Sequence, residues 1–431
     1  MYDGQAQTMS RDERAVLQEK RLRDLLDRLL AADGVQGRRL RDAGIASGDD
    51  VTLDDLPRLP TLTKPDLWEH YPWGLLSVQM RDVVAVHGSS GTGGRPTLVA
   101  YTRADLALWG RMCARSLSCA GATDASLVHN AYGYGLFTGG QGVHQGAIAL
   151  GATVLPMSGG MTARQARMIA DLKPDILTCT PSYAIRIGEE LRNLGIDPAD
   201  NGLRAGVFGA EPWSDGLRPV LEEILGLTAV DIYGLSEVIG PGVATECREA
   251  QDGLHVNEDH FLVEVVDPLS GEPVPDGTPG ELVFTTPTKE ALPLLRYRCG
   301  DIAALNRTTC ACGRTLARIT KILGRRDDML VIRGVNVYPS EVERVLLATP
   351  EIAPDYLLVV DRRTPVPRLL VACEAEAGAA ADGVEARLRE VLGLRAEVRV
   401  LPPGTVPRTD VGKAVRCVTW ESGEPPVAGL G

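Results

Sequence analysis

The sequence predicts an α/β protein with a large N-terminal domain of layered α/β sheets plus a β-rich module, followed by a small C-terminal α+β domain. Short apolar strands alternate with helical patterns as far as about residue 260, and strands and turns dominate beyond it. A separate order of strands and helices begins near residue 328. The length of 431 residues is sufficient for two or three domains. We therefore expect a large domain over residues 1–326 and a small, mobile domain over residues 327–431.

The large domain begins with an amphipathic helix over 11–32, in which leucines recur at three- and four-residue spacings. Alternating strands and helices follow, and this alternation favours mostly parallel sheets. We expect strands over 82–87, 98–102, 126–131, 152–156, 175–179, 205–208 and 229–233. We expect helices over 103–118, 141–150, 162–172, 182–194 and 214–225.

The β-rich module follows, with turn clusters at 270–273 and 275–277 between its strand-like segments. These segments cover 261–267, 280–286, 294–298 and 301–305. The small domain is expected to have strands over 329–333, 355–361, 368–376 and 396–401 and helices over 339–348 and 382–392. Its βαββαβ order is typical of a ferredoxin-like fold.

Composition and charge exclude several classes of protein. Hydrophobic residues make up 44% and charged residues 24% of the chain, which excludes disordered and fibrous classes. A net charge of −12 argues against a nucleic-acid partner. No apolar segment approaches the roughly 18 residues that a membrane span requires, and the charged first thirty residues do not resemble a secretory signal. Nine scattered cysteines favour a reducing, cytoplasmic location over a disulfide framework.

A glycine-rich segment over 87–97 is the clearest local motif. Its glycines and hydroxyl side chains offer many hydrogen-bond donors, which can surround phosphate oxygens. It is not a Walker A loop, because no Gly-Lys-Ser/Thr sequence opens a helix there and Pro96 discourages one. We expect a phosphate-binding loop between two strands, although a surface linker would have the same composition. The loop residues are Ser89, Ser90, Gly91, Thr92, Gly93, Gly94 and Arg95.

Eight further segments follow a known pattern in the same order along the chain. They include Tyr233-Gly-Leu-Ser-Glu237 and Pro407-Arg-Thr-Asp-Val-Gly-Lys413. The others cover 63–67, 71–75, 130–140, 209–213, 295–301 and 324–341. Together with the glycine-rich loop, they make the chain similar to the adenylate-forming enzymes (acyl-CoA synthetases, adenylation domains and luciferases). Within that superfamily it most resembles the phenylacetate–coenzyme A ligases, from about residue 50 to 416.

This resemblance implies an ATP-dependent activation of an aryl or arylacetyl carboxylic acid. The acid would form an acyl-adenylate with release of pyrophosphate, and the acyl group would then pass to the thiol of coenzyme A (CoA). An alternative acceptor is a carrier-protein thiol or an amine. A catalytically silent nucleotide-binding protein is a third reading, against which the presence of both Glu237 and Lys413 argues. A hydrolase is disfavoured because no Gly-x-Ser-x-Gly sequence is found, and the resemblance also implies a homodimer.

The resemblance further implies roles for individual residues. Glu237 would bind Mg²⁺, Ser236 would bond a phosphate oxygen, and Lys413 would bridge the carboxylate and the phosphate. Asp327 would be the hinge of the small domain. Tyr233 would pack beside the adenine, while Asp301 and Arg325 would contact the ribose. The nucleotide-binding set comprises the loop residues 89–95, Gly209, Ala210, Glu211, Pro212, Tyr233, Gly234, Ser236, Asp301 and Arg325.

Aromatic side chains gather in the segment that would bind the acid. Tyr132, Tyr134 and Phe137 lie within six positions, although aromatic residues make up only 4% of the chain. With Gly135 they form the expected acid pocket, because flat rings suit an aryl or arylacetyl group. A cluster in the protein core would show the same enrichment.

One group of residues has the composition of a zinc site. Cys310 and Cys312 share a short turn, and Cys247 and His255 lie upstream. Three thiolates and an imidazole form a common tetrahedral zinc set, and similar sequences often carry these residues. We therefore expect a structural Zn²⁺ site, with His260 as a possible substitute for His255. Reduced cysteines without a metal remain the alternative.

Overall fold

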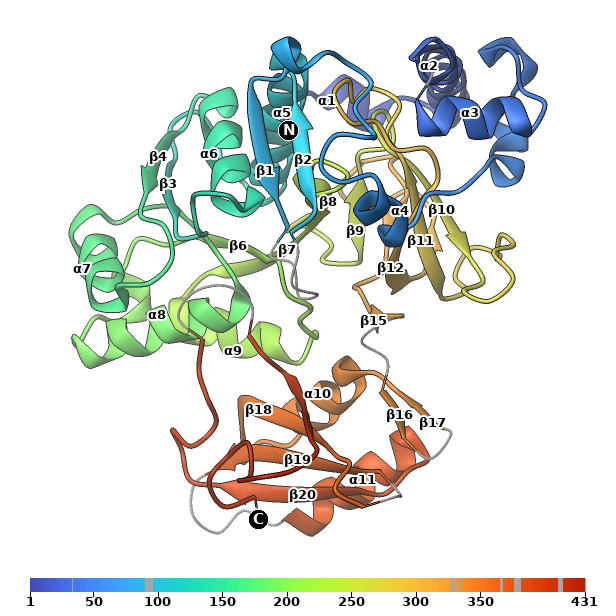
Figure 1. Cartoon of the computed structure of the whole chain (residues 1–431). Helices are drawn as coiled ribbons and strands as arrows, with labels where there is room; N and C mark the ends of the chain where they lie inside the picture. The colour runs from blue at the N-terminus through green and yellow to red at the C-terminus, as the bar shows by residue number, and fades with distance from the viewer. Residues whose placement is uncertain are drawn as a thin grey trace.

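The structure of the chain is a computed structural model that describes residues 1–32, 34–89, 96–326, 330–332, 335–364, 367–375, 381–409 and 414–430. It consists of a large N-terminal part and a smaller C-terminal domain, which holds the C terminus (Figure 1). Among the described strands, no sheet combines strands from the two parts. The layered α/β fold that the sequence predicts is therefore confirmed.

Helices at the N-terminus pack against the β-rich module. Ser10 and Glu13 form a capping box that begins the longest of them. Its leucines enter a core cluster that also includes Leu262 and Leu295 of the module. The helices are α1 (Gly4–Thr8), α2 (Arg11–Ala31), α3 (Val35–Asp42) and α4 (Lys64–Glu69), with short 3₁₀ turns at Gly48–Asp50, Leu53–Arg58 and Met80–Asp82.

A nine-stranded sheet forms the centre of the large part. Its order is β13-β14-β9-β8-β7-β6-β5-β3-β4, and neighbouring strands from β4 to β7 are parallel. The parallel strands are β3 (Leu127–Asn130), β4 (Thr153–Pro156), β5 (Ile176–Cys179), β6 (Ala205–Gly209) and β7 (Thr228–Leu235). The antiparallel strands are β8 (Gly240–Glu246), β9 (Leu254–Val256), β13 (Leu305–Asn306) and β14 (Arg318–Ile319). The covering helices are α5 (Arg103–Cys119), α6 (Thr138–Leu150), α7 (Thr162–Leu172), α8 (Pro181–Asn193) and α9 (Leu217–Leu225), with a 3₁₀ turn at Pro198–Asp200.

Two smaller sheets complete the large part. Strands β1 (Ala85–Gly88) and β2 (Leu98–Tyr101) form an antiparallel hairpin that brackets the glycine-rich loop, as expected. The second sheet has the order β10-β11-β12-β15, with β10 (Leu262–Val266), β11 (Gly280–Thr285), β12 (Tyr297–Ala303) and β15 (Gly324–Arg325). The separate strands expected over 294–298 and 301–305 are instead largely one strand, β12, because it stays paired with β11 through a register irregularity.

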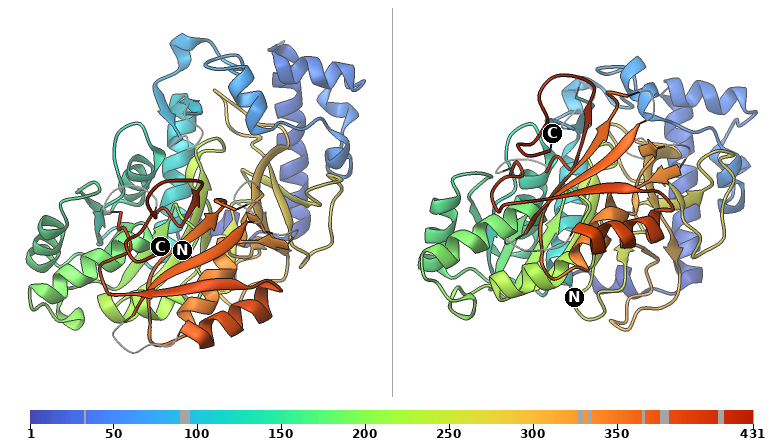
Figure 2. Two further views of the ribbon diagram at one scale, coloured as in Figure 1. Left: turned by 60° about the horizontal axis from the view of Figure 1, so that its bottom comes forward. Right: turned by 90° about the horizontal axis from the view of Figure 1, so that it is seen from below.

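The small domain has one four-stranded sheet with the order β20-β19-β18-β21. Alternate side chains of β18 (Ile352–Asp361) and β19 (Arg368–Ala375) face two different core clusters, one of which receives α10 (Pro339–Leu347) and α11 (Ala381–Leu392). The right-hand view of Figure 2 shows this domain from below. The strand expected over 329–333 lies outside this sheet: β16 (Leu330–Ile332) pairs with β17 (Val335–Val337) and with no other strand that the structure describes. Besides β20 (Ala396–Leu401), the sheet includes β21 (Cys417–Trp420), which the sequence pattern did not indicate.

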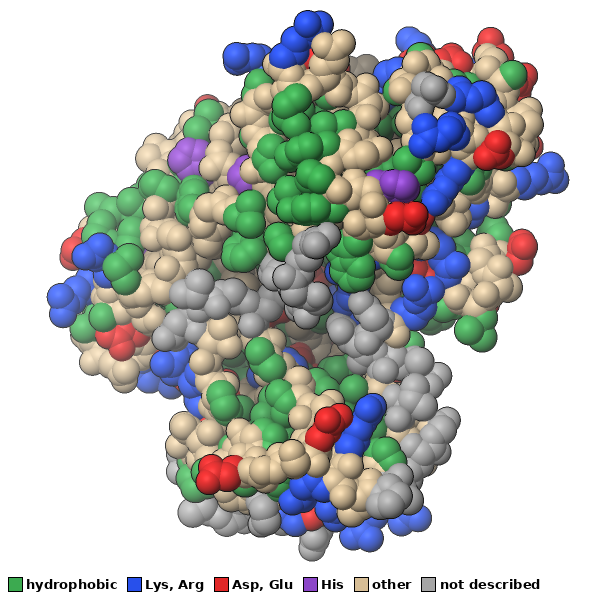
Figure 3. All heavy atoms as spheres, viewed as in Figure 1, with side chains coloured by type: hydrophobic (Ala, Val, Ile, Leu, Met, Phe, Trp, Pro, Cys, Tyr) green, Lys and Arg blue, Asp and Glu red, His purple; other side chains and the backbone are tan. Residues whose placement is uncertain are grey.

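Apolar side chains gather on the surface over the β1–β2 hairpin (Figure 3). Val84 and Val86 are 43% and 38% exposed. Within the described ranges, no helix is long and apolar enough to cross a bilayer.

Candidate active site

The predicted nucleotide-binding segments meet at one edge of the nine-stranded sheet. Strands β3, β5, β6 and β7 are parallel, so their carboxyl ends share that edge. Ligands of open α/β sheets bind outside such carboxyl ends. The segment 209–212 begins at the end of β6, and 233–237 covers the end of β7. The acid-pocket segment 132–137 follows β3.

Tyr233, Asp301 and Arg325 form a bonded group. The Tyr233 hydroxyl donates to Asp301 Oδ2 at 2.6 Å, and Arg325 donates to Asp301 Oδ1 at 2.8 Å. Asp301 and Arg325 are partners across β12 and β15, which fixes the ion pair. Burial and the adjacent Asp301 charge raise the pKa of Tyr233 well above its ordinary value. The structure thus brings together three residues expected at the adenosine.

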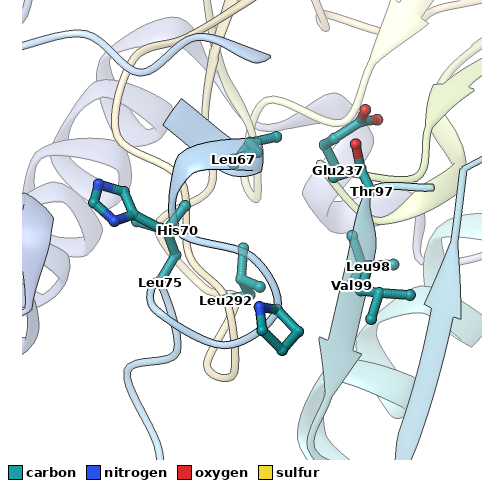
Figure 4. A pocket seen from close by; sticks show the side chains of 9 residues that line it. Leu67, His70, Leu75, Thr97, Leu98, Val99, Glu237 and Leu292 are labelled. Atoms are coloured by element: carbon teal, nitrogen blue, oxygen red, sulfur yellow. The ribbon is translucent and has the colours of Figure 1, made fainter. Parts of the chain in front are cut away.

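Glu237 and Thr97 line one small cavity between α4 and the hairpin (Figure 4). Glu237 is only 6% exposed, and none of the described residues bonds its carboxylate oxygens. The buried Thr97 hydroxyl also lacks a partner among the described atoms. Unsatisfied oxygen ligands from a carboxylate and a hydroxyl are suited to Mg²⁺, so these residues fit the expected metal. Ser236 lies beside them and shares a hydrogen bond of 3.1 Å with Thr138 at the start of α6.

Lys289 is a site residue that the sequence analysis missed. Its side chain is completely buried, and Nζ donates to the backbone carbonyl of Glu237 at 3.0 Å. Nζ also lies 5.2 Å from the ring centroid of Tyr101. Burial lowers the pKa of Lys289 to about 8, although the charges of Asp105 and Glu237 oppose this shift. No pattern marks Lys289 in the sequence, because it lies in the connection between β11 and β12.

The segment 209–212 forms a tight turn after β6. Ala210 has a φ of 70°, and Gly209 approaches the β7 backbone so closely that a Cβ would lie 2.1 Å from the carbonyl oxygen of Ile232. The Glu211 carboxylate accepts the backbone N–H groups of Ser182 and Ala414, at 2.8 and 2.7 Å. This carboxylate is therefore bonded to protein groups, including one that follows Lys413 in the sequence.

The expected acid-pocket aromatics differ in burial. Tyr132 is 6% exposed and belongs to a core cluster, whereas Phe137 is 47% exposed. Tyr134 lies between these extremes: its hydroxyl accepts a hydrogen bond from Asn130 at 2.8 Å and lies 3.1 Å from Nδ1 of His144. Gly135 has a φ of 112°, which favours glycine. Tyr134 and Phe137 are thus better placed than Tyr132 to contact a ligand.

Several predicted site residues lie outside the described part of the chain. They are Ser90, Gly91, Thr92, Gly93, Gly94 and Arg95 of the loop, together with Asp327 and Lys413. Ser89 is described: its N–H donates to the carbonyl of Thr97 at 3.0 Å, and its hydroxyl accepts the Thr97 N–H at 3.2 Å. These bonds close the base of the hairpin loop.

The cysteine cluster forms a second site, away from the strand ends. The ligand atoms of Cys247, His255, Cys310 and Cys312 all lie within 4.8 Å of one another. Cys247 Sγ is 3.8 Å from Cys310 Sγ, and Cys312 Sγ is 3.5 Å from His255 Nε2. Burial, followed by the Arg314 and Arg318 charges, lowers the pKa of His255 to about 3, which favours the neutral imidazole that binds metals.

His260 does not belong to this cluster. Its Nδ1 lies 2.8 Å from the Thr288 hydroxyl, and its Nε2 lies 3.3 Å from Asp259. The structure therefore places His255, and not His260, beside the three thiols.

The strand-end site and the two-part fold define an adenylate-forming enzyme, and comparisons with known proteins agree. Residues 33–289 match the family model of AMP-binding enzymes, and residues 334–419 match the model of the AMP-binding enzyme C-terminal domain. Phenylacetate-coenzyme A ligase of Thermus thermophilus is 46% identical over 96% of this chain and 98% of its own length. The Escherichia coli enzyme of that name is 45% identical, with 95% of each chain covered.

Solved structures give the same result. 2-Hydroxyisobutyryl-CoA ligase in its postadenylation state, in complex with R3-HIB-AMP, has a TM-score of 0.90 and 29% identity, covering 96% of this chain and 91% of that chain. The same ligase in its thioesterification state has a TM-score of 0.73 and 30% identity, with equal coverage. The chain belongs to the AMP-binding enzyme family, in its phenylacetate–coenzyme A ligase branch. The family expected from the sequence is confirmed, and the chain is an AMP-forming acid–thiol ligase.

Proposed function

We propose that the chain activates an aryl or arylacetyl carboxylic acid with ATP and transfers the acyl group to the thiol of CoA. In the first step a carboxylate oxygen attacks the α-phosphorus of ATP, and the bond to the leaving pyrophosphate breaks. In the second step the CoA sulfur attacks the acyl carbon, AMP leaves, and the thiol proton passes to solvent. Two observations carry this proposal: the bonded Tyr233–Asp301–Arg325 group, and Glu237, four residues after Tyr233, which lines a cavity with Thr97 at the base of the glycine-rich hairpin.

The residues at the strand ends have complementary parts in this proposal. Asp301 and Arg325 would hold the ribose, and Tyr233 would fix the orientation of Asp301. The loop 89–95 and Ser236 would contact the phosphates, and the predicted Lys413 would bridge carboxylate and α-phosphate. Glu237 and Thr97 would hold Mg²⁺, which supplies positive charge to the triphosphate when bound. Tyr134, Gly135 and Phe137 would line the acid-binding side.

The cysteine cluster supports a structural Zn²⁺ site. Three thiols and a neutral imidazole match the ligand set and spacing of tetrahedral zinc. Burial would raise the pKa of Cys312, but hydrogen bonds from Arg314 outweigh this effect and lower it, which favours the thiolate. A metal there would link the turn between β13 and β14 to β9. All four of its coordination positions would be occupied by protein side chains.

Other parts of the proposal rest on the sequence. The domain boundary at residues 326 and 327, with Asp327 as hinge, lies beside residues outside the described ranges. The resemblance supports a homodimer. The thiols of the cluster support a reducing compartment such as the cytoplasm.

The test is acid-dependent exchange of pyrophosphate into ATP, measured with benzoate, phenylacetate and their substituted forms. We expect exchange with at least one of these acids, and a CoA thioester of matching mass when CoA is added. Exchange without formation of a CoA thioester, but with acylation of an added carrier protein or amine, would show that the acceptor is that carrier protein or amine and not CoA. Absence of exchange across the whole panel would contradict acid activation.

A further inference from the structure

Two glutamates bond across the boundary between the large part and the small domain. Glu211 follows β6 of the large part, and its Oε2 accepts the N–H of Ala414 from the small domain at 2.7 Å. Glu343 on α10 of the small domain accepts, through Oε1, the N–H of Ser214 from the large part at 2.9 Å. Each side of the boundary therefore supplies one carboxylate and one backbone donor.

The second oxygen of each carboxylate is bonded within its own part of the molecule. Glu211 Oε1 accepts the N–H of Ser182 near the start of α8, at 2.8 Å. Glu343 Oε2 accepts the Tyr356 hydroxyl at 2.8 Å. Both carboxylates are thus held in position from their own side, which limits the entropy lost when the bond across the boundary forms. Hydrogen bonds to an ionised carboxylate are also stronger than neutral ones.

Arg416 supplies the matching positive charge. Its guanidinium carbon lies 4.6 Å from the ring centroid of Tyr356. Burial alone would lower the pKa of Arg416, but the Tyr356 hydroxyl and the carboxylates of Glu343 and Glu211 outweigh burial and raise it. Glu343, Tyr356 and Arg416 all belong to the small domain, so a reorientation of that domain would separate them from Glu211 of the large part.

Apolar packing accompanies the bonds. A Cβ at Gly216 would lie 3.0 Å from the Cβ of Leu347 on α10, so the turn after β6 closely approaches the small domain. Leu347 also packs against the core cluster that contains Trp213 and Leu217. The segment 211–216 is thus the part of the large domain that receives α10.

The arrangement of the two parts corresponds to one state of a solved relative. 2-Hydroxyisobutyryl-CoA ligase matches this chain with a TM-score of 0.90 in its postadenylation state and 0.73 in its thioesterification state, at the same coverage. Because the protein compared is the same, the two scores reflect a difference in its conformation. The bonds of Glu211 and Glu343 therefore belong to the arrangement that resembles the postadenylation state.

We propose that Glu211 and Glu343 form a two-way clamp, in which a carboxylate of each part bonds the backbone of the other, and that this clamp holds the small domain in the arrangement for adenylate formation and must open before thioester formation. This inference rests on the proposed function, because it assigns that arrangement to the first step. Ala414 directly follows Lys413, so the bond to Glu211 restricts the chain at the next residue. Both glutamates are positioning residues. Glu211 thereby has a purpose other than flanking the purine, the role its sequence motif implied.

The clamp is tested by measuring the two half-reactions separately in Glu211→Gln, Glu343→Gln and the double variant. Gln has the same shape as Glu, but its side chain is uncharged and has one acceptor oxygen in place of two. We expect the kcat of phenylacetate- or benzoate-dependent pyrophosphate exchange to fall about tenfold in each single variant, the loss of one charged hydrogen bond. Thioester formation from added acyl-adenylate and CoA should keep its wild-type rate or rise. Glu223→Gln, on the exposed face of α9, is the matched control and should change neither rate.

Other outcomes would overturn the clamp. Equal losses in both half-reactions would indicate general damage to the fold. A raised KM for ATP with an unchanged kcat in Glu211→Gln would indicate that Glu211 contacts the purine of ATP, the role that its sequence motif implied. Hydrogen exchange provides a readout that does not need catalysis: the amide of Ala414 should exchange faster in Glu211→Gln, and that of Ser214 faster in Glu343→Gln. Unchanged amide exchange would refute the clamp, whereas a wild-type protein without pyrophosphate exchange would refute only the proposed function.

Discussion

Replacing Lys289 with Met should lower the rate of adenylate formation without unfolding the protein. Met has similar length but no charge, so the bond from Nζ to the backbone carbonyl of Glu237 is lost. A hydrogen bond from a charged donor contributes about 1.5–3 kcal/mol. If this bond places Glu237 for the metal and the phosphates, the kcat of pyrophosphate exchange should fall roughly 10- to 150-fold.

The stability of this variant should change much less, because two effects oppose each other. Burial lowers the pKa of Lys289 from 10.5 to about 8. At pH 7, below both values, the cost of keeping the ammonium charged in the folded state is about 3 kcal/mol. Removing that cost offsets the lost hydrogen bond to within about 2 kcal/mol.

The assays are pyrophosphate exchange as a function of Mg²⁺ concentration and urea unfolding at pH 7. We expect a lower kcat, a higher Mg²⁺ requirement and nearly unchanged unfolding for Lys289→Met. Lys20→Met, on an exposed position of α2, is the control. The reasoning is refuted if the variant loses more than about 4 kcal/mol of stability and its activity follows the folded fraction, since Lys289 would then be only structural.

Further predictions concern the metal cluster, pH and the ribose site. Cys310→Ala should lose the zinc measured by elemental analysis and melt several degrees lower, whereas Cys373→Ala should keep its zinc; full zinc in Cys310→Ala would contradict the site. Burial raises the pKa of Asp231 to about 7, so between about pH 4 and 7 the folded state keeps a proton that the unfolded state releases. The free energy of unfolding should therefore fall as pH rises through that window, and urea titrations of Asp231→Asn should show a smaller fall. Asp301→Asn removes the partner charge of Arg325 and should raise the KM for ATP about tenfold; an unchanged KM would remove Asp301 from the nucleotide site.

Much of the fold follows from local patterns in the sequence. The helix Thr162–Leu172 and the strand Ala396–Leu401 have the expected bounds, because period and composition there agree with the tertiary environment. Strand β8 was missed even though it lies in the interior of the sheet, beside the central strand β7. Its sequence Gly-Pro-Gly-Val-Ala-Thr-Glu is rich in residues typical of turns, and only pairing with β7 and β9 makes it a strand.

The strand expected over 329–333 is present at Leu330–Ile332, but it does not join the sheet of the small domain. Its composition is that of a strand, but a composition does not determine which sheet the strand joins. In the structure Leu330–Ile332 pairs with the strand that follows it, and Cys417–Trp420, nearly ninety residues later, completes the sheet. Pairing between such distant segments depends on the packing of the whole domain.

Site residues could be predicted where their residue types and spacing are themselves typical of one function. The four members of the cysteine cluster could be named because thiols and imidazoles are uncommon and the spacing of a metal-binding set is restricted. Lys289 and Glu343 could not, because a lysine or a glutamate in a polar sequence is usually exposed to solvent. Their importance arises from burial and from partners 52 and 129 residues away.

The most direct test of the account is a crystal structure of the full chain with AMP. We predict that the ribose hydroxyls lie against Asp301, the phosphate faces Glu237 and the glycine-rich loop, and the adenine lies beside Tyr233 and the turn after β6. AMP bound elsewhere, remote from both carboxylates, would contradict the assignment of this edge of the sheet as the site where the acid is activated.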